Sequence, residues 1–193
     1  MKCFIDIETT GLNPHVHEII EVAIIFDDRE KYHRFIKPQR FEFADPLALT
    51  INKFHERSGE WQDAISQEQL AFELACLLHK RIIIGHNPSF DMSFIQELLD
   101  QHGEAFLSRN RLVDTITLAH EHLSPIGLKR LSLDSIRSFL GWSKEDAHTA
   151  MKDCEDVQKL YIMLSRATCF DRLKWKMQKL SRGIKAKRSK AKQ

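Results

Sequence analysis

The first forty residues alternate between apolar runs and polar turns, which is the pattern of β-strands. Residues 1–11 (MKCFIDIETTG) and 18–26 (EIIEVAIIF) are rich in the β-branched and aromatic side chains that favour strands. Residues 31–37 (KYHRFIK) alternate polar and apolar, and the polar turn at 27–30 predicts that they form the returning strand of a hairpin. Residues 18–26 are mostly apolar, so we expect that strand to be central in its sheet.

Beyond residue 66 the apolar spacing changes to that of helices. Leu70, Leu74 and Leu78 recur at helical spacing, and Asn87 is predicted to cap a helix whose first residue is Pro88. Helices are expected at 67–80, 88–102, from 114, 131–140 and 147–165, with short strands at 81–84 and 112–113 and a short helix between Pro46 and Gly59. Three strands followed by strands alternating with helices predict an α/β layered domain with a mixed sheet.

Length and composition fit one soluble domain with an appendage. The chain has 193 residues, of which 42% are hydrophobic and 29% are charged. Because a strand begins almost at once, we expect no signal peptide, and no apolar run approaches the roughly 20 residues of a membrane-spanning helix. The widely spaced cysteines (Cys3, Cys76, Cys154, Cys169) predict reduced residues in a cytoplasmic protein, with Cys3 and Cys76 in the core.

Charge is unevenly distributed along the chain. Residues 166–193 contain eleven Lys or Arg and one acid, whereas residues 1–165 contain 18 basic and 26 acidic residues. A basic extension of this kind is expected to be helical at first and then disordered. It could attract nucleic acid, bind a polymerase or another protein partner through Trp175, Met177 and Leu180, or be a solvated end without a role.

Asp6 and Glu8 are the first candidates for chemistry. Side chains at i and i+2 of a strand point to the same face, roughly 6.5–7 Å apart, so these two carboxylates project together. Like charges in an apolar strand are costly unless a cation neutralises them, and oxygen ligands suit Mg²⁺ or Mn²⁺. The alternative is an exposed edge strand with two solvated acids.

Three further residues are candidates by their position. Asp91 lies in the first turn of the helix that follows the strand at 81–84, where open α/β sheets build their sites, although an acid there also suits the helix dipole. His148 and Asp153 are five residues apart, so they cannot share a helix face. They act together only if His148 lies on the loop or first turn, and a solvent-exposed histidine is the alternative.

Together these residues form a pattern that resembles the DnaQ-like DEDDh 3′→5′ exonuclease family. The resemblance covers about residues 2–165. It rests on the segments 4–12 (FIDIETTGL), 18–22 (EIIEV), 86–91 (HNPSFD), 113–115 (VDT), 131–134 (LSLD) and 148–153 (HTAMKD). It implies an RNase H-like three-layer α/β domain over residues 1–165, with a mixed sheet of about five strands flanked by helices. The histidine at 148 is typical of the DEDDh rather than the DEDDy branch.

The resemblance also implies a mechanism. Asp6, Glu8, Asp91 and Asp153 would bind two divalent cations, Mg²⁺ or Mn²⁺, and His148 would act as the general base. The expected reaction is hydrolysis of single-stranded nucleic acid, with DNA favoured, from the 3′ end to 5′-mononucleotides. Substrate contacts are expected from two groups of residues. The first follows Glu8 and consists of Thr9, Thr10, Gly11 and Leu12. The second lies in the loop at 47–62 and consists of Ile51 and Phe54.

Two alternatives stay open at this point. The motifs serve DNA and RNA alike, so the chain could be a 3′→5′ exoribonuclease of the same family. It could also be a nucleic-acid-binding polymerase-accessory module with weak activity, although such a module has no need of all five site residues. The loop at 47–62 departs from the family pattern, which weakens the contacts expected from Ile51 and Phe54.

Overall fold

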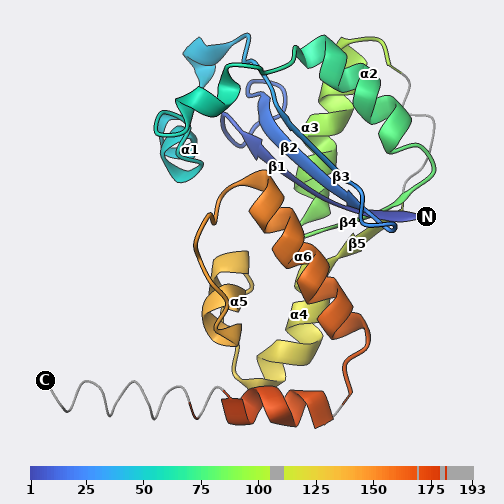
Figure 1. The fold of residues 1–193 in the computed structure, drawn as a ribbon, viewed down its shortest axis with the longest axis vertical. Coiled ribbons are helices and arrows are strands. Elements are labelled where there is room, and N and C mark those ends of the chain that lie inside the picture. Colours follow the sequence, from blue (N-terminus) through green and yellow to red (C-terminus); the bar gives the residue numbers. More distant parts are fainter. Residues whose placement is uncertain (105–110, 169, 179–180, 182–193) are drawn as a thin grey trace, which may run out of the picture. The chain divides into compact units, whose positions relative to one another are not determined.

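A five-stranded mixed sheet is the main feature of the computed structural model of the chain (Figure 1). Its strands are β1 (Lys2–Thr9), β2 (Ile19–Phe26), β3 (Lys31–Phe35), β4 (Ile82–Gly85) and β5 (Arg111–Asp114). They lie in the order β3-β2-β1-β4-β5, with β1 antiparallel to β2 and parallel to β4. The expected hairpin, the mixed sheet and the number of strands are all confirmed.

The structure describes residues 1–104, 111–168, 170–178 and 181. The α-helices named in it are α1 (Pro46–Ile51), α2 (Gln67–Leu77), α3 (Pro88–Gln101), α4 (Thr115–Leu123), α5 (Leu133–Leu140) and α6 (Ala150–Ser165). Short 3₁₀ helices, which the sequence pattern did not predict, are η1 (Phe41–Phe43), η2 (Ser58–Trp61) and η3 (Ser124–Ile126). Within this described part, no helix has both the length and the apolar character needed to cross a bilayer.

The chain divides into two compact units, and α6 belongs to both. The first unit, residues 1–114 and 146–158, contains the sheet, α1, α2, α3 and the start of α6. The second, residues 115–145 and 159–193, contains α4, α5 and the end of α6. The domain boundary expected after residue 165 stays a prediction.

The core of the first unit separates the two faces of β1. Cys3, Ile5 and Ile7 are buried with apolar residues of α2 and α3, such as Leu74 and Phe94. Since successive side chains of a strand alternate between faces, Asp6 and Glu8 point to the opposite face of the sheet. The packing that fixes β1 therefore also fixes the direction of its two acids.

The second unit has its own apolar core, formed by residues of α4, α5 and α6 that include Leu123, Ile136 and Leu160. Residues 170–178 are helical, and Trp175 packs against this core. Met177 is exposed. Leu180 and the expected disorder beyond Gly183 lie outside the described residues, and a partner for the basic extension stays a prediction.

Two expectations about individual residues were wrong. Cys76 is exposed rather than in the core, because it follows the buried Leu74 by two residues, or about 200° around α2. Asn87 precedes α3 but its side chain makes no capping hydrogen bond. Its backbone is left-handed, with φ of 70°, whereas a capping side chain normally acts from extended backbone. Cys3 is buried as expected, and Cys169 lies outside the described residues.

Leu74 and Phe72 on α2 provide a test of this core. We expect Leu74→Ala to lower the free energy of unfolding by about 2–5 kcal/mol, because its side chain is fully buried. Phe72→Ala should cost less than about 1 kcal/mol, because 60% of that residue is exposed. Urea unfolding followed by circular dichroism measures both, and equal losses would contradict the assignment of the buried face.

Candidate active site

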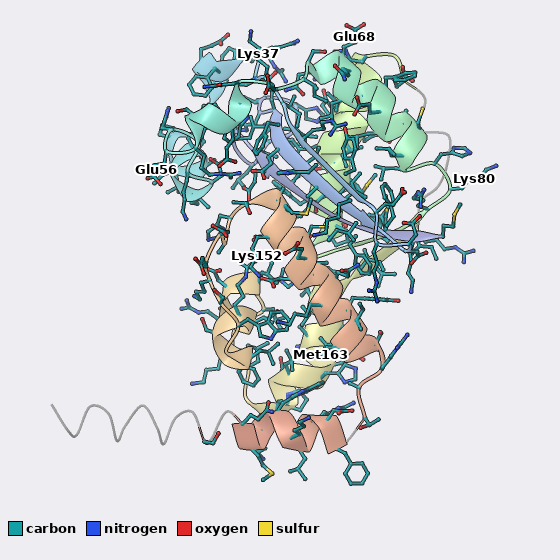
Figure 2. The ribbon with its side chains drawn as sticks, in the orientation of Figure 1. Lys37, Glu56, Glu68, Lys80, Lys152 and Met163 are labelled. Carbon is teal, nitrogen blue, oxygen red and sulfur yellow. The ribbon has the colours of Figure 1, made fainter. Side chains whose placement is uncertain are left out.

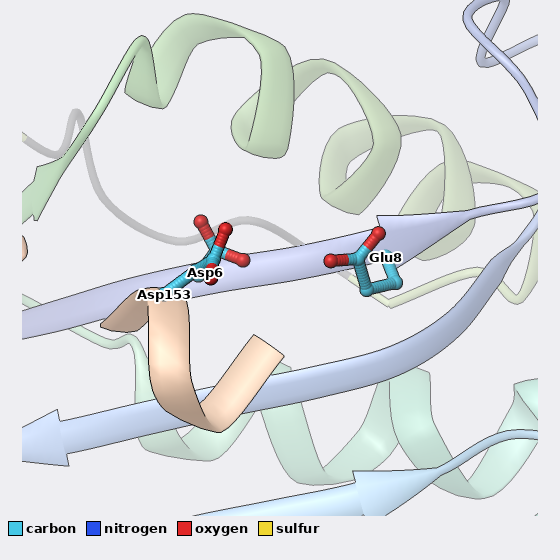
Figure 3. Close-up of side chains that lie close together, drawn as sticks. All are labelled: Asp6, Glu8 and Asp153. Atoms are coloured by element: carbon cyan, nitrogen blue, oxygen red, sulfur yellow. The ribbon is translucent and has the colours of Figure 1, made fainter. Parts of the chain in front are cut away.

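Three carboxylates from two distant segments converge on one face of the sheet. Asp6 and Glu8 come from β1, and Asp153 comes from the first turn of α6 (Figure 3). Each offers a ligand oxygen, and these atoms all lie within 4.8 Å of one another. We call Asp6, Glu8 and Asp153 the carboxylate trio. The structure thus brings together three of the four acids that the sequence marked as metal ligands.

Asp91 lies in the first turn of α3, and its carboxylate contacts the backbone of β1. Strand β4 pairs with β1 only as far as Phe4, and beyond that point the Oδ1 atom of Asp91 accepts the N–H of Ile7 at 3.1 Å. Asp91 is buried, and its carboxylate takes the place of a neighbouring strand as the acceptor for the N–H of Ile7, the residue between Asp6 and Glu8. It is not within the 4.8 Å group, so its predicted contact with a cation stays a prediction.

His148 lies on the loop that precedes α6, as its expected action requires. Its backbone is left-handed, with φ of 65°, and its N–H donates to Oδ1 of Asp153 at 3.2 Å. The N–H of Asp153 in turn donates to the carbonyl oxygen of Thr149 at 3.0 Å. These two bonds hold the loop that carries His148 beside an acid of the trio. A non-glycine residue at positive φ is uncommon and often marks a functional site.

Burial and mutual repulsion hold the site acids in an unfavourable electrostatic state. Burial, then repulsion from Asp153 and Glu21, raises the pKa of Glu8 to about 8. Burial raises the pKa of Asp91 to about 7, despite hydrogen bonds that lower it. The pKa of Asp6 is raised well above its ordinary value by burial, then by Asp153 and Asp91. Oxygen-only ligands with raised pKa values fit a hard divalent cation, whose charge would offset this cost.

Glu21 is a site neighbour that the sequence analysis did not identify. It pairs with Glu8 across β1 and β2, so both side chains lie on the same face. Nε2 of His33 lies 2.9 Å from one carboxylate oxygen of Glu21, and Nη1 of Arg57 donates to the other at 2.9 Å. Burial would raise the pKa of Glu21, but these bonds outweigh it and lower the pKa. An acid in the otherwise apolar run at 19–26 was the sequence signal.

Thr9 at the end of β1 and Thr10 after it are held by local hydrogen bonds, and the substrate contacts expected from residues 9–12 stay predictions. The hydroxyl of Thr9 donates to the carbonyl of Gly11 at 2.6 Å, and the hydroxyl of Thr10 accepts the N–H of Glu18 at 2.9 Å. A side chain at Gly11 would overlap the ring of His17. Leu12 is 78% exposed.

Segment 45–61 is attached directly to the end of β1. The N–H of Asp45 donates to the carbonyl oxygen of Thr10 at 2.7 Å. The side-chain amide of Asn52 donates to the carbonyl oxygen of Thr9 at 3.2 Å. Sequence analysis did not identify Asn52. Ile51 is 47% exposed, whereas Phe54 is half-buried. The rings of Phe41 and Trp61 lie 5.3 and 4.7 Å from that of Phe54. The segment therefore lies beside the trio, and the substrate contacts expected from it stay predictions.

Comparison with protein families and characterised proteins agrees with this arrangement. The family model RNase_T, described as Exonuclease, matches residues 3–161. The chain is 30% identical over 166 residues to a PolC-type DNA polymerase III of Thermotoga maritima, covering 82% of this chain and 11% of that protein. It is 28% identical over 188 residues to the DNA polymerase III subunit epsilon of Buchnera aphidicola, covering 85% and 70%.

A third relative is the ribonuclease T of Shewanella denitrificans, which is 27% identical over 180 residues, covering 81% of this chain and 76% of that protein. Among solved structures, E. coli exonuclease I in complex with a dT13 oligonucleotide has a TM-score of 0.69 and 19% identity, covering 86% of this chain and 42% of that one. The chain thus spans about a tenth of the PolC-type relatives and less than half of exonuclease I.

The likeness to exonuclease I supports the fold, a five-stranded mixed sheet flanked by helices. The family match covers both strands of the hairpin, the trio, Asp91 and His148. The chain therefore belongs to the RNase T/DnaQ-like exonuclease family.

Proposed function

We propose that the chain is a metal-dependent 3′→5′ exonuclease that removes 5′-mononucleotides from the 3′ end of single-stranded nucleic acid. The observation that carries the proposal is the convergence of Asp6, Glu8 and Asp153 within 4.8 Å, beside the loop of His148. DNA is the favoured substrate, because one of the relatives named above is a DNA polymerase and another is a DNA polymerase subunit.

Each site residue has a role in this proposal. Asp6, Glu8 and Asp153 would hold one divalent cation, and Asp6 with Asp91 would hold a second. When bound, such cations activate water and stabilise the charge that develops on the attacking and leaving oxygens at phosphorus. His148 accepts the proton of the attacking water, because histidine is the side chain that most often serves as a general base.

The remaining contacts orient the 3′ end. Backbone groups of Thr9 to Leu12, which follow Glu8 directly in the chain, bind the terminal sugar or phosphate in this proposal. Ile51 and Leu12 offer exposed apolar surface to the last base. Phe54 supports this surface through its ring contacts with Phe41 and Trp61.

A second candidate is an exoribonuclease with the same site. The similarity to ribonuclease T, over 76% of that protein, favours this reading. The site residues act on phosphate and water, which DNA and RNA share, so the chemistry is the same for both substrates.

Degradation of labelled oligonucleotides tests the proposal. Single-stranded DNA and RNA of equal sequence, labelled at the 5′ or the 3′ end, are incubated with Mg²⁺, Mn²⁺ or chelator. We expect a ladder from 5′-labelled DNA, early release of a labelled mononucleotide from 3′-labelled DNA, and no product with chelator. A faster reaction with RNA would favour the second candidate, and internal cuts or no cleavage would contradict both.

Variants separate an enzyme from a binding module. Asp6→Ala removes a ligand of the trio and should abolish cleavage. His148→Ala should lower kcat by about 10²–10⁴-fold, the usual contribution of a general base. His120→Ala is the matched control, because that histidine is exposed on α4. Wild-type rates in both His148→Ala and Asp6→Ala would refute the assigned roles.

Stability without metal should fall as pH rises. The raised pKa values of Glu8, about 8, and Asp91, about 7, mean that the folded chain binds protons more tightly than the unfolded chain. Their contribution is therefore complete at low pH and is lost as pH rises through those values. We expect Tm in chelator to decrease from pH 5 to pH 8.5, and saturating Mg²⁺ or Mn²⁺ to offset the decrease.

Asp6→Asn is the informative variant for that measurement. It removes one like charge, so Tm in chelator at pH 8 should rise while the response to metal is lost. Asp63→Asn, which changes an exposed acid, should behave as wild type in both respects. A Tm that is the same with and without metal in the wild-type chain would count against the proposed cation site.

A further inference from the structure

A groove of about 410 Å³ lies beside the carboxylate trio in the first unit. Glu21 and His33 of β2 and β3 form its floor, and Glu21 is the cross-strand partner of Glu8. The groove therefore lies on the same face of the sheet as the trio. One wall comes from residues 53–60 and the other from residues 146–155, where α6 begins.

Arg57, in the first wall, forms ion pairs with one buried carboxylate and one exposed carboxylate. Nη1 of Arg57 donates to Glu21 at 2.9 Å, and Nη2 donates to Glu60 at 2.7 Å. The side chain of Glu21 is 0% exposed, whereas that of Glu60 is 45% exposed. The guanidinium also lies over the rings of Phe35 and Trp61, at 5.6 and 5.4 Å. Nε of Arg57 also donates to Glu60, at 3.2 and 3.3 Å, so this pair is bidentate. Glu21 and the rings fix the position of Arg57, and Glu60 is the partner that faces solvent.

Several other charges of the groove already have partners. Glu155 pairs with Lys31 at 2.7 Å, and Lys152, labelled in Figure 2, pairs with Asp156 at 2.9 Å. Lys53 is exposed, and its φ of 56° belongs to the turn that ends α1, where the N–H of Phe54 donates to the carbonyl of Leu49 at 3.0 Å. Arg57 and Lys53 are thus the cations that this wall can offer to an anion.

We propose that the groove binds a backbone phosphate of the nucleic-acid strand, with Arg57 as its contact and Glu60 as the group that the phosphate displaces. This inference rests on the proposed function. The fork of a guanidinium matches a phosphate as well as a carboxylate, so the exchange keeps the hydrogen bonds of Arg57. Glu21 stays in place and continues to hold the guanidinium.

Two charge-matched variants test the exchange. Glu60→Gln and Glu56→Gln each remove one negative charge from the same segment, but only Glu60 is bonded to Arg57 (Glu56 is labelled in Figure 2). Binding of a fluorescein-labelled dT12 oligonucleotide is followed by anisotropy in chelator. Glu60→Gln should lower Kd by about two- to fivefold, the usual range for an exposed ion pair, and Glu56→Gln should change it less.

Arg57→Lys and Arg57→Gln test the contact itself. Both should raise Kd, and Arg57→Gln should reduce the slope of log K against log salt by about 0.7, as expected for one lost contact to a single strand. Arg57→Lys keeps a positive charge beside Glu21 in case the glutamine variant does not fold. Equal effects of Glu60→Gln and Glu56→Gln, or an unchanged Kd in a folded Arg57 variant, would overturn the inference.

A substrate without further phosphates separates this inference from the proposed function. The p-nitrophenyl ester of thymidine 5′-monophosphate has one phosphodiester and cannot reach the groove while its phosphorus is at the trio. We expect the wild-type chain and the Glu56→Gln control to hydrolyse this ester at the same rate. If the wild-type chain cleaves neither the ester nor oligonucleotides, the proposed function fails. If it cleaves both but Kd does not respond to Arg57 or Glu60, only the groove assignment fails.

Discussion

Repulsion between carboxylates on one face of a sheet is the constraint on which this structure depends. Asp6 and Glu8 lie on β1 with Asp153 above them, and burial raises the pKa values of Asp6 and Glu8. Such an arrangement costs stability in the free chain and is kept only if something else holds it together. The apolar packing of the opposite face of β1, against α2 and α3, supplies that support.

The same constraint explains the neighbouring hydrogen bonds. Asp91 accepts a backbone N–H that β4 leaves unpaired, and Asp153 accepts the N–H of His148. Glu21, which lies next to Glu8, is satisfied by His33 and Arg57. Asp91, Asp153 and Glu21 are therefore held in position by the protein itself, which is a condition for a preorganised site.

The sequence predicted the parts of the site that depend on local periodicity. The alternation of a strand was enough to place Asp6 and Glu8 on one face. The helix period showed only that His148 and Asp153 could act together if His148 lay on the loop or first turn, and the helix expected from residue 147 begins at Ala150 instead. Contacts made by residues distant in sequence were not predictable in this way. Arg57 and Asn52 meet β2 and β1 only through the path of segment 45–61, and Asn87 follows the needs of a tight turn rather than its capping propensity.

The central claim is that residues from the N-terminal strand and from α6 bind the same cation. Anomalous diffraction from crystals soaked in Mn²⁺ measures this most directly, because it locates the ion without assumptions about activity. We predict a strong peak with oxygen ligands from Asp6, Glu8 and Asp153 at about 2.0–2.2 Å, the usual range for small hard cations. A fully occupied Mn²⁺ elsewhere on the chain, with no peak at the trio, would contradict the account.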